Sequence, residues 1–86
     1  MLNKQPENPN LAPIELDVFQ EYYLEVAKKE LAKAVECFKP GQVRRARGQE
    51  FLREALLFYT KLPSGFTDKD FSQEYDRTYN LAYRGF

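Results

Sequence analysis

The sequence contains no histidine and a single cysteine, Cys37, and these two absences exclude most kinds of site chemistry. Histidine is the commonest general base and the commonest transition-metal ligand in proteins. Without it, one thiol cannot build a zinc site within the chain, and a Cys37 nucleophile would lack its usual activating base. We therefore expect no enzyme activity, no cofactor and no metal. Cys37 is interpreted as a small hydrophobic residue at the margin of a core.

Long apolar runs and an excess charge are also lacking. No stretch approaches the roughly 18 apolar residues of a membrane span, and the N-terminal segment MLNKQPENPN has no apolar part of signal-peptide length. One cysteine cannot form a disulfide within the chain, which favours a reducing compartment. The 13 basic and 13 acidic side chains cancel. We expect a soluble, cytoplasmic protein with no membrane partner.

Apolar residues recur at helical spacing through most of the chain, and no stretch alternates with a period of two for long enough to predict a strand. The longest run predicts a helix over residues 14–38. Pro13 suits its first position, and Glu15 and Asp17 would complement the helix dipole in its first turn. Its apolar stripe is formed by Leu16, Phe19, Tyr23, Leu24, Ala27, Leu31, Ala34, Val35 and Phe38.

A second helix is predicted over residues 42–62, between two segments that break helices. Lys39-Pro40-Gly41 precedes it and Pro63-Ser64-Gly65 follows it. Gly48 falls on the apolar face of this helix, where glycine lowers helix propensity by about 1 kcal/mol relative to alanine. Its position indicates a close approach to the first helix.

A third helix is predicted over residues 68–84. Thr67 and Asp70 resemble a capping box, and Phe66 and Phe71 occupy the positions of a hydrophobic staple, which places the helix start at Asp68. Its apolar stripe is mainly aromatic and contains Phe71, Tyr75, Tyr79 and Ala82, with Tyr83 and Phe86 at its edge and Gly85 as a stop signal.

Together these elements predict an all-α protein, a three-helix up-down-up bundle. Short connections make consecutive helices antiparallel neighbours. Residues 13–86 would form one domain. Residues 1–12 carry too little apolar surface to offset the entropy of ordering, and are predicted to be a flexible arm.

Charge is unevenly distributed along the neutral chain. Residues 26–53 carry eight basic and three acidic side chains, a net +5, whereas residues 1–25 sum to −4 and residues 54–86 to −1. In an antiparallel hairpin the basic residues gather around the Pro40-Gly41 connection, which we call the basic tip. Its candidate partner-binding residues are Lys33, Lys39, Arg44, Arg45 and Arg47. Their guanidinium and ammonium groups suit carboxylates or phosphates, unless the tip is only solvated with Glu36 as a partner across the hairpin.

A minor apolar stripe on the second helix is the other candidate surface. Val43, Ala46 and Leu57 fall away from the main stripe. Either the third helix covers them, or Val43 and Leu57 form a partner or homodimer surface.

These features favour a small non-catalytic protein-interaction or regulatory module. It would bind a protein partner, or a second copy of itself, through the basic tip, the minor stripe or both. The alternative is nucleic-acid binding, with the basic tip on phosphates and tyrosines stacked on bases. The neutral total charge, the long helices and the tight loops argue against that alternative.

Overall fold

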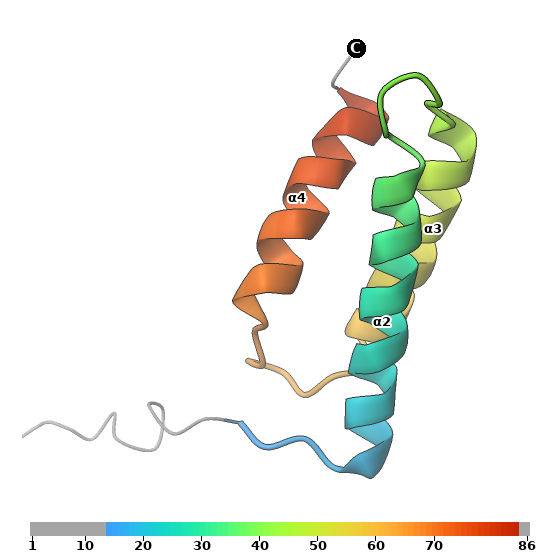
Figure 1. The fold of residues 1–86 in the computed structure, drawn as a ribbon. Coiled ribbons are helices and arrows are strands. Elements are labelled where there is room, and N and C mark those ends of the chain that lie inside the picture. The colour runs from blue at the N-terminus through green and yellow to red at the C-terminus, as the bar shows by residue number, and fades with distance from the viewer. Residues whose placement is uncertain (1–13, 85–86) are drawn as a thin grey trace, which may run out of the picture.

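The computed structural model describes residues 14–84, which form three α-helices joined by short connections (Figure 1). The helices are α2 (Val18–Glu36), α3 (Arg45–Tyr59) and α4 (Lys69–Tyr83). They run up, down and up, and no strand occurs within residues 14–84. The predicted all-α three-helix bundle is confirmed. The arm predicted over residues 1–12 and the stop signal at Gly85 lie outside the described residues.

Helix α2 begins at Val18, so the predicted start near residue 14 is wrong. The N-terminal cap is Asp17, whose Oδ1 accepts a hydrogen bond from the Gln20 N–H at 2.8 Å. In return, the Gln20 Oε1 accepts from the Asp17 N–H at 2.9 Å. This capping box satisfies two backbone donors that a helix start would otherwise leave without partners, and it therefore fixes the first turn.

The connection from α2 to α3 is longer than predicted. Helix α2 ends at Glu36, and the Phe38 N–H bonds to the Val35 carbonyl in a tighter turn. Helix α3 begins at Arg45 rather than at residue 42, because the Arg44 N–H turns back to the Cys37 carbonyl at 2.7 Å. Gly41 between them has φ of 86°, which favours glycine.

Helix α3 ends at Tyr59, three residues before the predicted end. The Lys61 and Leu62 N–H groups bond to carbonyls three residues earlier, so the chain leaves the α-helix in a tighter turn. Leu62 is nevertheless buried. Its apolar spacing therefore reflects core packing in a turn and not a further helical turn.

Helix α4 begins at Lys69, and its cap is Asp68 instead of the predicted Thr67. The Asp68 carboxylate accepts from the Phe71 N–H at 3.0 Å, and the Asp68 N–H donates to the Tyr59 hydroxyl at 2.9 Å. The predicted capping box is wrong because the cap is one residue later, at Asp68, whose N–H donates to Tyr59 of α3 and not to a side chain of α4. The hydrogen bond from Phe71, with help from Lys28 Nζ at 3.3 Å, holds the pKa of the Asp68 carboxyl below its usual value.

The core lies mainly between α2 and α3, which pack against each other far more extensively than α4 packs against either. Small residues allow this approach: Ala27, Ala34 and Ala55 are fully buried. The close approach predicted at Gly48 is confirmed, because a Cβ there would lie 2.6 Å from Cζ of Phe38 and closer still to its Cε2. The ring that closes on α3 therefore comes from the turn after α2.

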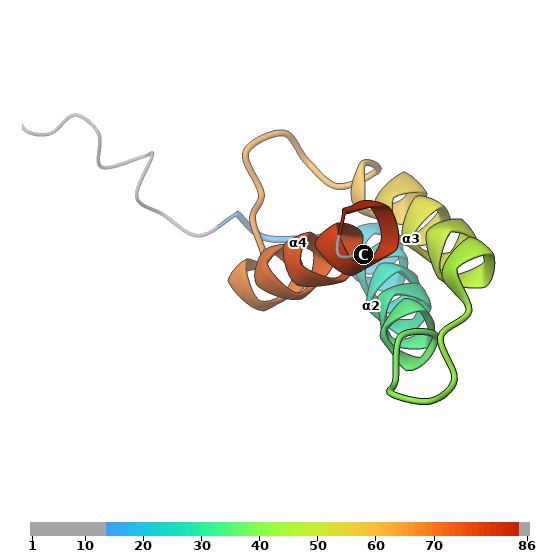
Figure 2. The ribbon, with the colours of Figure 1, turned by 90° about the horizontal axis from the view of Figure 1, so that it is seen from above.

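Helix α4 packs on the hairpin of α2 and α3 along its length, with Phe71, Thr78 and Ala82 buried, and its axis diverges from the other helices toward its N-terminus (Figures 1 and 2). At its start, the Phe71 ring stacks on Tyr59 with centroids 4.2 Å apart. At its end, Gln49 Nε2 donates to the Ala82 carbonyl at 3.0 Å.

A row of rings continues along α4 from Phe71 through Tyr75 and Tyr79 to Tyr83. Burial raises the pKa of Tyr75. Tyr79, predicted in the core stripe, is instead 41% exposed. Within the described part of this stripe, Tyr79 and Tyr83 therefore lie at the surface, whereas Phe71 and Ala82 are buried.

Candidate functional site

The basic tip forms where the last turn of α2 meets the first turn of α3. Lys33 comes from α2, Arg44 is the cap of α3, and Arg47 lies in the first turn of α3. The turn after Glu36 and the bond from Arg44 to the Cys37 carbonyl bring these two helix ends together. Lys33 from one helix and Arg44 and Arg47 from the start of the next therefore border one depression.

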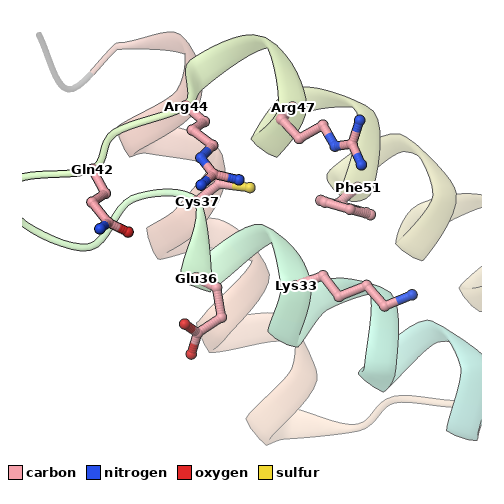
Figure 3. Close-up of a pocket in the computed structure, with 7 residues that line it drawn as sticks. All are labelled: Lys33, Glu36, Cys37, Gln42, Arg44, Arg47 and Phe51. Carbon is pink, nitrogen blue, oxygen red and sulfur yellow. The ribbon is translucent and has the colours of Figure 1, made fainter.

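This depression has a volume of about 310 Å³ and a mixed lining (Figure 3). Its walls are formed by Lys33, Glu36, Cys37, Gln42, Arg44, Arg47 and Phe51. The Phe51 ring lies between a cation from each helix, with the Arg47 guanidinium carbon 5.4 Å and the Lys33 Nζ 5.7 Å from its centroid. Such contacts contribute about 0.5–1 kcal/mol at exposed sites and hold the two cations over the depression.

The cations of the tip differ in their ion pairing. Lys33 Nζ is 3.1 Å from Glu30, and Lys39 Nζ is 3.0 Å from Glu36. Glu36 therefore pairs with the lysine three residues after it. The predicted pairing of Glu36 with a cation across the hairpin is wrong. Within residues 14–84, no carboxylate lies within ion-pair distance of the guanidinium groups of Arg44 and Arg47.

Of the seven residues predicted to bind a partner, Lys33, Arg44 and Arg47 line this depression. Lys39 lines a neighbouring groove beside Phe38 and α4. Arg45 is exposed at the first position of α3.

The two apolar candidates, Val43 and Leu57, are 45% and 51% exposed. Helix α4 therefore does not bury the minor stripe, and the role predicted for it stays a prediction.

Sequence reasoning missed Phe51, Gln42 and Cys37 as lining residues. Phe51 follows Arg47 by four residues, so helical spacing alone places the ring beneath the guanidinium. Gln42 and Cys37 line the depression because residues 42–44 do not belong to α3. The sequence contains no pattern that predicts this non-helical segment.

An exposed apolar end of α2 was also missed. Val18, Phe19 and Tyr22 are 78%, 72% and 61% exposed, although Phe19 was predicted in the core stripe. The first turns of α2 project beyond the ends of α3 and α4, so no neighbouring helix covers them (Figure 1). Helical spacing predicts which side of α2 carries Phe19. It does not predict how far the neighbouring helices extend along α2.

The described part of the chain lacks two further features. None of its helices has the length and apolar character needed to cross a membrane. Residues 14–84 also contain no group of three or more histidine, cysteine, aspartate or glutamate side chains placed to hold a metal ion.

Comparisons of the chain with protein-family models, with curated protein sequences and with solved structures give no match.

Proposed function

We propose that the protein is a small non-catalytic interaction module of the cytoplasm, and that its basic tip binds an acidic segment of a protein. The observation that carries this proposal is the position of Arg44 and Arg47. Their guanidinium groups border the same depression as Lys33, and neither has a carboxylate partner within residues 14–84. A guanidinium group binds a carboxylate with two parallel hydrogen bonds, so an acidic side chain fits this site.

The surroundings of the depression favour a protein over a nucleic acid. A phosphate backbone needs a continuous track of cations. Here, the adjoining depression on α2 and α3 is lined by the carboxylates of Glu30, Glu50 and Glu54, together with Arg47, Phe51 and Arg53. A duplex or single strand that continued past the tip would meet these negative charges. A short peptide that ends its contacts at the tip would not.

The test is a binding titration with two kinds of probe. A fluorescent peptide rich in glutamate and aspartate is compared with single- and double-stranded oligonucleotides at about 0.02 M and about 0.15 M salt, where the Debye length falls to about 8 Å. The variant is Arg44→Glu/Arg47→Glu. Lys61→Glu/Lys69→Glu, at the opposite end of the bundle where α3 connects to α4, makes the same charge change away from the tip.

We expect the peptide to bind wild-type protein and the control variant alike, and to bind the tip variant at least about tenfold more weakly, since a hydrogen bond to a charged group contributes about 1.5–3 kcal/mol. Equal binding to all three proteins would refute the assignment of the tip. Preferential binding of oligonucleotides that is lost in the tip variant would establish the nucleic-acid alternative instead.

A further inference from the structure

The exposed apolar end of α2 and the basic tip share one strip of the same helix. Residues spaced alternately by three and four positions lie on one side of an α-helix. This spacing connects Phe19, Tyr22, Val26, Lys29, Lys33 and Glu36. Lys33 and Glu36 line the depression at one end of the strip, and Phe19 and Tyr22 are exposed at the other end.

The two ends of this strip carry opposite charge. Residues 14–25 contain four carboxylates, those of Glu15, Asp17, Glu21 and Glu25, and no basic side chain. The region from residue 26 to residue 53, which contains the basic tip, has a net charge of +5. The strip is therefore flanked by carboxylates at its aromatic start, and at its end, where Glu36 also lies, by the basic side chains of Lys33, Arg44 and Arg47. A surface of this kind is complementary to itself when it is turned through 180°.

We infer that the partner at the basic tip is the N-terminal end of α2 from a second copy of this chain, in an antiparallel dimer with two-fold symmetry. This inference rests on the proposed function, because it names the acidic segment that the tip binds. In the matching register, Phe19 of one copy lies opposite Glu36 of the other, and Tyr22 lies opposite Lys33. The symmetry axis passes between Val26 and Lys29, so every contact is made twice.

This register places the aromatic start of each strip over the cations at the basic tip of the partner. The Tyr22 ring meets the Lys33 ammonium, and the Phe19 ring reaches the side of the depression bordered by Arg44, where cation–π contacts are favourable. Glu21 and Glu25 face the basic half of the partner strip. The same contacts remove the Phe19 and Tyr22 rings from water, so the hydrophobic effect also favours the dimer.

The experiment measures the oligomeric state by sedimentation velocity for two charge-reversed variants, separately and mixed. One variant is Glu21→Lys/Glu25→Lys at the acidic end, and the other is Lys29→Glu/Lys33→Glu at the basic end. All four positions are on the surface of α2, and circular dichroism checks that each variant is folded. We expect wild-type protein to dimerise and each variant alone to be monomeric, because both of its symmetric contacts become repulsive.

Mixing the two variants in equal amounts is expected to restore a dimer. In the mixed pair, each reversed end meets an end of opposite charge. This rescue is predicted only if the acidic end of α2 in one copy pairs with the basic end of α2 in the other, so a general loss of stability cannot imitate it. Variants that still dimerise alone, or a mixture that stays monomeric, would overturn the inference.

The apolar part of the interface is tested by Phe19→Ser/Tyr22→Ser, with Leu57→Ser on α3 as the matched control. We expect the first variant to raise the dimer dissociation constant at least about tenfold and the control to leave it unchanged. Dimerisation lost in Leu57→Ser but kept in Phe19→Ser/Tyr22→Ser would place the interface on α3 and overturn the inference.

The inference and the proposed function fail separately. Wild-type protein that is monomeric up to about 1 mM, but binds the acidic peptide at the tip, refutes the dimer and leaves the proposed function standing. Wild-type protein that neither dimerises nor binds the peptide refutes both.

Discussion

Replacing Gly48 by alanine tests whether the packing of Phe38 on α3 decides the residue at this position. In an open helical position alanine would stabilise the protein by about 1 kcal/mol relative to glycine. Here its Cβ would lie 2.6 Å from Cζ of Phe38 and 3.3 Å from Cβ of Cys37, so the ring has to move. Overpacking costs about 1–3 kcal/mol. We expect a net loss of about 1 kcal/mol, which lowers Tm by about 4–8 °C in a chain of this size.

A double-mutant cycle separates the clash from other effects of the substitution. Phe38→Leu removes the ring atoms that the new Cβ would meet. In that background Gly48→Ala is expected to stabilise by up to about 1 kcal/mol, so the coupling free energy is about 2 kcal/mol. Urea denaturation followed by far-UV circular dichroism measures all four proteins. If Gly48→Ala has the same effect in both backgrounds, or stabilises the wild-type protein, the argument from close packing is refuted.

Three further predictions concern the caps of α2 and α4. Asp17→Ala removes the capping box and is expected to cost about 1 kcal/mol in urea denaturation, whereas Glu15→Ala, which lies outside the helix, should cost almost nothing. Tyr59→Phe keeps the ring stacked on Phe71 but removes the acceptor for the Asp68 N–H; a loss of about 0.5–1.5 kcal/mol with unchanged helix content is expected, and no loss would show that water replaces the hydroxyl. Because the folded-state pKa of Asp68 is lowered, its contribution to stability is present above the usual value of 3.8 and is lost as pH falls through the lower folded value. Asp68→Asn should therefore lose less stability than wild-type protein between neutral and acid pH, and equal losses would contradict this assignment.

The three helices could be predicted from the sequence because helical spacing is strong in each of them, but their starts depended on competing caps. Asp17 with Gln20 three residues later is a capping-box pattern that the sequence does contain, but a helix that starts at Pro13 places Asp17 within its first turn and not at its cap. The cap of α4 is different. Thr67 and Asp68 are both good caps, and the hydroxyl of Tyr59, from another helix, decides between them. Such a tertiary contact is not visible in local sequence.

The candidate site could be predicted only in part, again because some of its features depend on contacts between helices. Charge along the chain located the basic tip, and Lys33, Arg44 and Arg47 do border one depression. Phe19 was assigned to the core because its spacing fits the stripe. Helical spacing fixes the side of the helix on which a side chain lies. Burial also requires a neighbouring helix beside that position, and the start of α2 projects beyond both neighbours. The length of each neighbour depends on its caps, so an error in a helix boundary becomes an error in the site.

Helix α4 is the least extensively packed of the three helices. Helices α2 and α3 share most of the core, whereas α4 is held by the Tyr59–Phe71 stack, the cap at Asp68, the buried Thr78 and the bond from Gln49 to Ala82. Segments with fewer buried contacts unfold locally at lower free energy than the whole domain. Backbone amides of α4 should therefore exchange with deuterium sooner than those in the middle of α2 and α3. The helical hairpin is the slow-exchanging unit of the fold, and it carries the basic tip.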